Sequence, residues 1–344
     1  MTIALDREAD PDRLRDFVFR AVVEVGATLN TALVVLGDKL GLYRALAGAG
    51  PLTPTELANR TGTAPRYVQE WLCAQAAGGF VEYDPDTARY SLAPEQAVAL
   101  TDEASPAFLP GLFQFAFGSV IDSRRITEVS KTGEGVGWHE HVSDVYEGCE
   151  RFFRPVYSAH LTTSWLPSLD GVVRKLEAGA LVADVGCGRG ASTELMAQAY
   201  PNSRFFGSDQ HGESIDVARK RAEAAGLTDR LSFDISLASA FGGGPYDLVT
   251  MFDCLHDMGD PVTAARHVHA SLKPGGTWLI VEPAAADRME DNINPVGRAY
   301  YCFSTLLCTP SSLAQAVGVA LGAQAGEARL RTLVTVAGFS SFRR

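Results

Sequence analysis

A glycine-rich run is the segment of this chain that points most directly to chemistry. The residues Asp184-Val185-Gly186-Cys187-Gly188-Arg189-Gly190 follow an apolar stretch at 181–183 and precede a helix-like stretch at 192–200. Glycine adopts positive φ at little cost and lets the main chain approach a ligand closely. The run therefore predicts a strand, a tight turn and a helix that together hold a nucleotide-like ligand.

The same glycines fit two kinds of nucleotide site. Gly186, Gly188 and Ala191 satisfy the dinucleotide pattern G-x-G-x-x-G/A. Asp209 lies about 20 residues further on, where a ribose-binding carboxylate is expected. An NAD(P)-dependent oxidoreductase is therefore one interpretation. The glycines are not followed by Gly-Lys-Ser/Thr, which argues against a P-loop.

Strand-like and helix-like segments alternate after the turn. Strands are predicted at 204–209, 231–235, 246–252 and 277–282, and helices at 213–225 and 261–272. This alternation predicts an α/β fold with a Rossmann-like, doubly wound, mostly parallel sheet. Ligands of such sheets bind at the carboxyl ends of the strands. The residues at these ends are Gly186, Asp209, Phe252, Asp253 and Glu282.

Taken together, the motifs from residue 181 onward resemble the class I S-adenosylmethionine-dependent methyltransferases. They are the Asp-x-Gly-x-Gly-x-Gly turn, the strand-end Asp209, Tyr246-Asp247-Leu248-Val249, and Leu272-Lys273-Pro274-Gly275-Gly276. Cys254-Leu255-His256-Asp257-Met258, followed by Asp260, is similar to the His-Asp-Trp segment of the small-molecule O-methyltransferases that carry an N-terminal winged-helix domain. The bacterial two-domain members of that group are the most similar.

The resemblance implies how S-adenosyl-L-methionine is held. Asp184 and the turn, which includes Gly186, Cys187 and Gly188, would hold the methionine end. Asp209 would take the ribose hydroxyls, because a carboxylate offers two acceptor oxygens. The same site would be lined by Gln210, Phe252 and Asp253. The family commonly has an acid near the adenine amino group, but that position is Leu237 here, so the backbone around Ala238 would contact adenine.

The resemblance also implies a general base. The methyl group of a sulfonium is already activated, so holding the acceptor in line supplies most of the rate. A phenol, with a pKa of about 10, must still lose its proton, and an imidazole with a reference pKa of about 6.5 suits that task. His256 would be the base and Glu282 the acid that orients it, with S-adenosyl-L-homocysteine as the product.

The acceptor is less well determined than the base. O-methylation of a small aromatic or apolar metabolite is favoured, while nitrogen, carbon and carboxylate acceptors stay open because the fold serves all of them. Asp257 is expected to cap a helix, with a role as a second active-site acid as the alternative. The aromatic residues of 292–303, which are Tyr300, Tyr301 and Phe303, should cover the acceptor. His139 and His141 do not share a helical face, so no metal site is predicted.

The first 100 residues predict a different domain. A helix at 17–36 has too many polar interruptions to span a membrane and is expected to pack against a partner. Two short helices, opening at 53–58 and spanning 64–77, precede a hairpin of 80–83 and 89–92, which makes a winged helix-turn-helix. Residues 1–100 hold 9 Lys and Arg against 13 Asp and Glu, which argues against binding to nucleic acid. We expect this domain to form a homodimer and to wall the substrate pocket; a ligand-sensing regulator that binds DNA is the alternative.

Composition and length complete the expectations. The predicted parts are a dimerisation domain at 1–100, a helical linker and pocket segment at 101–170, and the catalytic domain at 171–344. The net charge of −11 favours neither nucleic acid nor an anionic membrane as a partner. No signal peptide is recognised and the six cysteines form no Cys-x-x-Cys pair, so a cytoplasmic location is expected. The resembled fold ends in two strands, for which few residues follow the helix predicted at 327–337.

Overall fold

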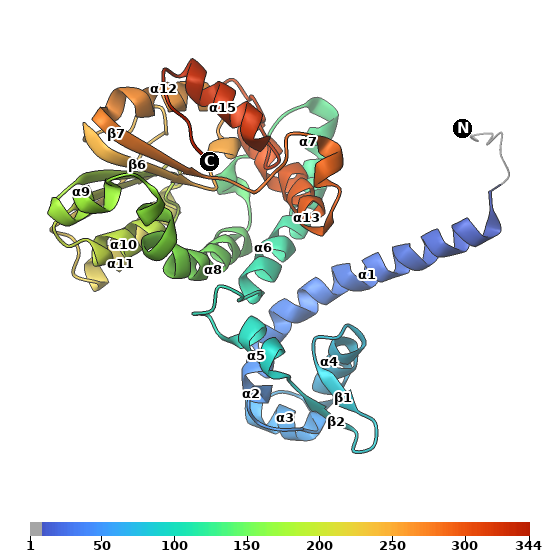
Figure 1. Cartoon of the computed structure of the whole chain (residues 1–344). Coiled ribbons are helices and arrows are strands. Elements are labelled where there is room, and N and C mark those ends of the chain that lie inside the picture. Colours follow the sequence, from blue (N-terminus) through green and yellow to red (C-terminus); the bar gives the residue numbers. More distant parts are fainter. Residues whose placement is uncertain (1–8) are drawn as a thin grey trace. The chain divides into compact units, whose positions relative to one another are not determined.

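The computed structural model describes residues 9–344, which divide into two compact units (Figure 1). The first contains the residues up to Glu103 together with Ala107–Phe117, and the second contains Ala104–Pro106 and Gly118–Arg344. Most of the segment at 101–170 therefore belongs to the compact unit that contains the parallel sheet.

The first unit is built from helices and one hairpin. Its elements are α1 (Pro11–Lys39), α2 (Leu42–Leu46), α3 (Pro54–Thr61), α4 (Pro65–Ala77), β1 (Glu82–Asp84), β2 (Arg89–Ser91) and α5 (Pro94–Thr101). Thr53 and Glu56 form a capping box at the start of α3. In the core, Trp71 meets Tyr43 edge to face with ring centroids 5.0 Å apart, and its indole N–H donates to the carbonyl of Leu33 at 2.9 Å. The predicted winged helix-turn-helix is confirmed.

Helix α1 differs from the expectation. Val34 and Val35 are buried, but large apolar side chains stay exposed along the preceding turns: Leu14, Phe17, Val18, Phe19, Val22, Val23, Val25 and Leu29. By length and composition α1 meets the requirements of a membrane span, which core helices and signal sequences also meet. The argument that polar interruptions exclude a span was therefore wrong. An exposed apolar surface of this extent is typical of an interaction site.

The second unit contains five parallel strands, counted over the described residues. They are β3 (Leu181–Val185), β4 (Arg204–Asp209), β5 (Leu231–Ile235), β6 (Tyr246–Phe252) and β7 (Leu272–Val281), in the order β5-β4-β3-β6-β7. The predicted doubly wound, parallel sheet is confirmed. Strand β7 begins earlier than predicted, because Leu272 already pairs with Tyr246 before the register shifts.

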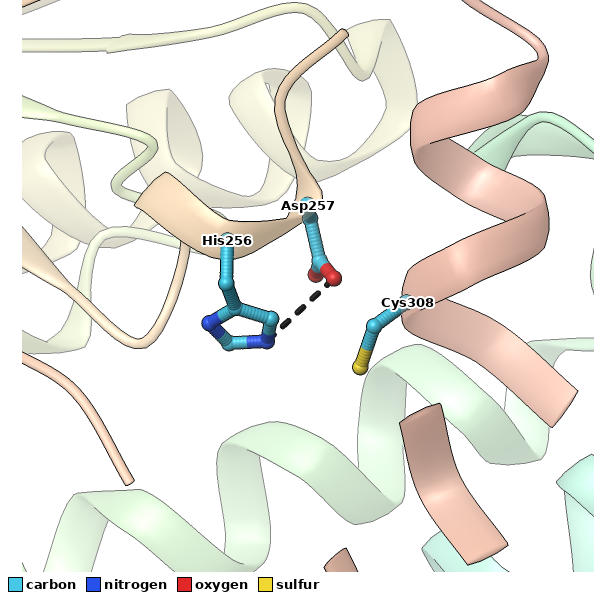
Figure 2. Close-up of side chains that lie close together, drawn as sticks. All are labelled: His256, Asp257 and Cys308. Atoms are coloured by element: carbon cyan, nitrogen blue, oxygen red, sulfur yellow. Dashed lines mark ion pairs between the residues drawn. The ribbon is translucent and has the colours of Figure 1, made fainter. Parts of the chain in front are cut away.

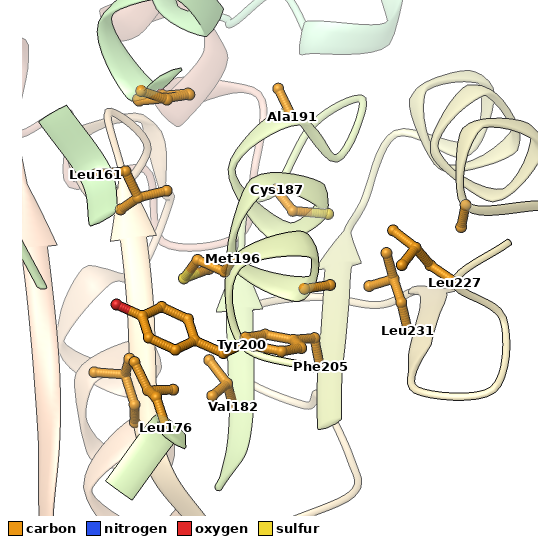
Figure 3. Close-up of a cluster of buried hydrophobic side chains, with 14 of the residues drawn as sticks. Leu161, Leu176, Val182, Cys187, Ala191, Met196, Tyr200, Phe205, Leu227 and Leu231 are labelled. Atoms are coloured by element: carbon orange, nitrogen blue, oxygen red, sulfur yellow. The ribbon is translucent and has the colours of Figure 1, made fainter. Parts of the chain in front are cut away.

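Helices pack on both faces of this sheet. The remaining α-helices of the described residues are α6 (Pro110–Ile121), α7 (Ser123–Thr132), α8 (Ser143–His160), α9 (Val172–Ala178), α10 (Ala191–Ala199), α11 (Gly212–Ala224), α12 (Pro261–Ser271), α13 (Pro295–Phe303), α14 (Thr309–Leu313) and α15 (Gly326–Val336). Successive residues of β3 point to opposite faces. Val182 joins a cluster with Met196 and Phe205 (Figure 3), and Ala183 joins another with Val249 and Leu333.

No strand follows α15 within the described part of the chain. Instead, Phe339 packs on His269 and Trp278, with ring centroids 5.0 and 5.2 Å apart. Phe342 lies beneath the guanidinium of Arg331, 4.4 Å from its central carbon. The C-terminal residues therefore place aromatic side chains against α12, β7 and α15.

Candidate active site

The glycine turn joins β3 to α10 and has left-handed backbone at each glycine. The φ angle is +73° at Gly186, +52° at Gly188 and +78° at Gly190, a region that residues with a Cβ avoid. A Cβ on Gly186 would lie 2.6 Å from the sulfur of Cys254, and one on Gly190 would lie 2.7 Å from the ring of Phe233. A Cβ on Gly188 would meet nothing within 4 Å. Packing therefore requires two of the glycines, and the third faces open space that a ligand could fill.

Asp184 lies beneath the turn and is fully buried. One carboxylate oxygen accepts the hydroxyls of Ser192 and Thr193 at 2.6 and 2.7 Å, and the other accepts the hydroxyl of Thr250 at 2.8 Å. Burial raises the pKa of Asp184, and these hydrogen bonds oppose the shift. Asp184 thus ties the first turn of α10 to β3 and β6. The contact of Asp184 with the methionine end of the cofactor stays a prediction. Because neither carboxylate oxygen is exposed, Asp184 would position that end indirectly, by holding the glycine turn.

Asp209, at the end of β4, holds the turn from another side. Its Oδ2 accepts the N–H of Gly188 at 2.9 Å and its Oδ1 accepts the N–H of His211 at 2.8 Å. Burial raises the pKa of Asp209, and these two hydrogen bonds oppose the shift. Each oxygen keeps a lone pair for a further donor. The strand-end acid is therefore attached to the same turn that faces open space.

Exposed aliphatic side chains continue the edge beyond Asp209. Ile235 pairs with Asp209 in the sheet, and Ile235 and Leu237 are 56% and 55% exposed. Gln210 is exposed and Ala238 is half-buried, whereas Cys187 is buried beneath the turn. The sequence analysis did not select Ile235, because an apolar residue at the end of a strand is usually part of the core.

A histidine and a glutamate meet at the ends of β6 and β7, because these strands are parallel neighbours. His256 lies in the 3-10 turn Leu255–Asp257, and its Nδ1 makes a short hydrogen bond with Oε2 of Glu282. Oε1 of Glu282 accepts the N–H of Leu255 at 2.9 Å. His256 is 2% exposed. The structure therefore brings together the two residues predicted as base and orienting acid.

Asp257 faces the other ring nitrogen and caps no helix. Its Oδ1 lies 3.3 Å from Nε2 of His256 (Figure 2). The cap of α12 is Asp260, which accepts the N–H of Thr263 at 2.9 Å, so the capping role expected for Asp257 was wrong, and the alternative of a second active-site acid stays a prediction. Burial opposes a charge on His256, but the carboxylates of Glu282 and Asp257 outweigh it and hold the pKa of His256 well above its usual value.

Asp253 adds another carboxyl group to this place. Its φ angle of +53° is left-handed, which is uncommon for a residue with a side chain and is found at functional sites. One of its oxygens lies within 4.8 Å of ligating atoms of His256 and Glu282. Burial raises the pKa of Asp253 to about 7, with Glu282 and Asp257 adding to the shift and His256 opposing it. The carboxyl groups of Asp253, Asp257 and Glu282 thus all lie close to the imidazole of His256.

Aromatic side chains pack around this end of the sheet. Phe252 contacts Tyr157 and Trp165, with ring centroids 5.4 and 6.1 Å apart. Burial raises the pKa of Tyr300 to about 12, and Asp253 adds to the shift, which indicates that α13 lies near these carboxyl groups. His141 bonds Asp122 through Nδ1 at 2.8 Å. Among the described residues, neither His139 nor His141 belongs to a cluster of metal-ligating side chains.

Two family descriptions match the chain. "Methyltransferase domain" matches residues 183–278, and "Rv2258c-like winged HTH domain" matches residues 28–102. A ubiquinone biosynthesis O-methyltransferase of Bordetella avium is 31% identical over 132 residues, which are 38% of this chain and 52% of the relative. The methyltransferase GfsG of Streptomyces halstedii is 24% identical over 182 residues, 48% of this chain and 65% of that protein. The chain spans about half the length of the first of these relatives.

Solved structures resemble the chain over almost its whole length. An O-methyltransferase family protein from Burkholderia thailandensis has a TM-score of 0.69 at 19% identity, covering 95% of this chain and 94% of that one. Human N-acetylserotonin methyltransferase, in complex with S-adenosylmethionine, has a TM-score of 0.67 at 17% identity, covering 100% and 95%. At these identities the similarity shows a shared fold.

Proposed function

We propose that this chain, in which a methyltransferase domain follows a winged helix-turn-helix domain, transfers a methyl group from S-adenosyl-L-methionine to a hydroxyl of a small aromatic or apolar metabolite. The observation that carries the proposal is the buried pair of His256 and Glu282 at the ends of β6 and β7. Strand β3, which ends in the glycine turn, is the neighbour of β6. The methyltransferase match favours this function over the NAD(P)-dependent oxidoreductase.

The residues around the turn fit the sulfonium cofactor. The open space at Gly188 admits a ligand close to the main chain, and the free lone pairs of Asp209 suit two ribose hydroxyls. Ile235 and Leu237 offer exposed apolar surface for a purine. The backbone near Ala238 is left to bond the adenine amino group, since Leu237 has no polar atom in its side chain. When bound, S-adenosyl-L-methionine supplies an activated methyl group.

The pair of His256 and Glu282 suits general-base catalysis on a hydroxyl. Glu282 accepts the Nδ1–H of His256, which makes Nε2 the basic nitrogen. Nε2 takes the proton of the acceptor hydroxyl while the oxygen of that hydroxyl attacks the methyl group. Glu282 stabilises the imidazolium that forms. The carboxylates raise the pKa of His256. A raised pKa makes the neutral imidazole a stronger base, but it also means that the imidazole is neutral only at higher pH.

Substitution of His256 tests this role. We expect His256→Ala to keep its affinity for S-adenosyl-L-homocysteine, measured by calorimetry, and to lose roughly 10²- to 10⁴-fold in turnover on a hydroxyl acceptor. The acceptor would be found by screening phenols and hydroxylated metabolites for release of S-adenosyl-L-homocysteine. His267→Ala is a matched control, because His267 lies on α12 and bonds the carbonyl of Phe241. Unchanged turnover in His256→Ala would remove His256 from the role of base.

We also propose that α1 pairs with α1 of a second copy. Its exposed apolar side chains, such as Phe17, Val22 and Leu29, lie on several faces of the helix. An exposed apolar surface of this extent is typical of an interaction site, and 29 residues extend over about 43 Å. Phe17→Glu with Leu29→Glu should convert a dimer to a monomer by light scattering, whereas Arg20→Glu should not. A monomeric wild type, or one that binds to neutral lipid vesicles, would contradict this assignment.

A further inference from the structure

A mixed cluster of nitrogen, oxygen and sulfur atoms lies at the ring nitrogen of His256 that Glu282 does not contact. Nε2 of His256, a carboxylate oxygen of Asp257 and Sγ of Cys308 lie within 4.8 Å of one another (Figure 2). Cys308 ends the π-helical turn Ser304–Cys308, a type of turn that is frequent at functional sites. His256 and Cys308 are 2% and 6% exposed. The three side chains therefore converge in a mostly buried place.

The thiol of Cys308 hydrogen-bonds the carboxylate of Asp257, but one oxygen of that carboxylate is left without a hydrogen bond. Oδ1 of Asp257 lies 3.3 Å from Nε2, yet the atom is buried and accepts no hydrogen bond from any described residue. A buried carboxylate oxygen without a donor is costly, and a bound cation would remove that cost. A tetrahedral zinc ion with bonds of about 2.0–2.1 Å places its nitrogen and oxygen ligands about 3.3–3.4 Å apart. The observed separation matches this value.

The hydrogen bond between Glu282 and His256 is typical of a histidine that binds a metal ion. Such a histidine usually donates its other ring N–H to a carboxylate, which fixes the orientation of the ring, and Nδ1 of His256 is bonded to Glu282. Imidazole and thiolate ligands favour zinc over magnesium or calcium, which prefer oxygen. Zinc needs its sulfur and nitrogen ligands about 3.6 Å apart, and Sγ of Cys308 lies within 4.8 Å of the ligating atoms of His256 and Asp257. Asp257 has a side chain that is 22% exposed, which gives an ion a way in.

We propose that His256, Asp257 and Cys308 form a zinc-binding site whose occupation blocks the base. Zinc bonded to Nε2 occupies the lone pair that would accept the acceptor's proton, and its binding releases the Nε2 proton of His256 and the thiol proton of Cys308 to water. The binding of zinc follows from the cluster alone. The blocking effect rests on the proposed methyl transfer.

Cobalt(II), a spectroscopic substitute for zinc, tests the binding without cofactor or acceptor. One equivalent of cobalt should give a thiolate-to-metal charge-transfer band in the near ultraviolet, which zinc abolishes. Cys308→Ser should lose the band, and Cys302→Ser should keep it because Cys302 is exposed. His256→Gln and Asp257→Asn should keep the fold by circular dichroism and bind zinc at least about 10-fold more weakly in competition with a chromophoric chelator. A band that persists in Cys308→Ser, or equal zinc affinity in wild type and both other variants, would overturn the site.

The blocking effect is tested separately. One equivalent of zinc should inhibit release of S-adenosyl-L-homocysteine, and a chelator should restore it. Zinc that binds at this site without inhibition would overturn the blocking role. An enzyme that turns over no hydroxyl acceptor, even with chelator, would contradict the proposed function and leave the binding result intact.

Discussion

Two glycines of the turn should respond differently to the same substitution. Gly186→Ala puts a Cβ into left-handed backbone, which costs about 1 kcal/mol, and places it 2.6 Å from the sulfur and 2.8 Å from the Cβ of Cys254. Overpacking of this kind costs about 1–3 kcal/mol. The sum is about 2–4 kcal/mol of unfolding free energy. Gly188→Ala also puts a Cβ into left-handed backbone, but this Cβ meets no atom within 4 Å. It should therefore lower the unfolding free energy by only about 1 kcal/mol.

Thermal unfolding and calorimetry measure the two effects. At about 2–4 °C per kcal/mol for a unit of this size, Gly186→Ala should lower the Tm by roughly 4–16 °C and Gly188→Ala by roughly 2–4 °C. Gly188→Ala should instead weaken binding of S-adenosyl-L-homocysteine, because its Cβ fills the space proposed for the ligand. Gly226→Ala is the matched control, with φ +65° and nothing within 4 Å, and should alter the Tm alone. Equal loss of Tm in Gly186→Ala and Gly188→Ala would refute the packing argument, and unchanged affinity in Gly188→Ala would refute the ligand space.

Three further outcomes are expected, each measured with EDTA present. Asp209→Asn should weaken binding of S-adenosyl-L-homocysteine about 10- to 100-fold in calorimetry, since hydrogen bonds to a charged acceptor contribute about 1.5–3 kcal/mol; an unchanged Kd would contradict the ribose contact. The kcat of the wild type should rise with pH as His256 loses its proton, and Glu282→Gln should move this rise to lower pH because the carboxylate that raises the pKa of His256 is gone; coincident profiles would contradict the orienting role. The pKa of Asp253 is about 7 in the folded protein and about 3.9 in the unfolded chain. The contribution of Asp253 to the free energy of unfolding is therefore fully present below about pH 4 and is lost as the pH rises through 7. Asp253→Asn, which tolerates left-handed backbone, should therefore gain stability relative to the wild type between pH 4 and 8, by at most about 4 kcal/mol; parallel stability curves would contradict this.

Local patterns were sufficient for most of the sheet. Strands β4, β5 and β6 begin and end at the predicted residues, because the alternation of side chains and the glycine breaks act within a few residues. The start of β7 was predicted wrongly, since the Lys-Pro-Gly-Gly run reads locally as a break. The pairing of Leu272 with Tyr246 extends the strand through it, and that pairing depends on a neighbouring strand.

The side chains beside His256 show where local patterns were insufficient. An aspartate shortly before a helix is a typical cap, and Asp257 was assigned as one, but Asp260 caps α12 and Asp257 faces Nε2. Cys308 carried no signal in the sequence, because it lies far downstream on another element. The hydroxyls that surround Asp184 were missed for the same reason, since Thr250 reaches it from β6.

By itself the sequence determined which residues stand at the ends of the strands: the glycine turn, Asp209, Asp253 and Glu282, while His256 was selected by the resemblance of its segment to a known family. It could do so because strand periodicity and the φ freedom of glycine are properties of short segments. The tertiary structure decided which of these residues face one another, which oxygens are buried, and that Cys308 and Asp257 share a nitrogen of His256. Those relations arise from contacts between segments far apart in the chain, whose free energies no local pattern contains.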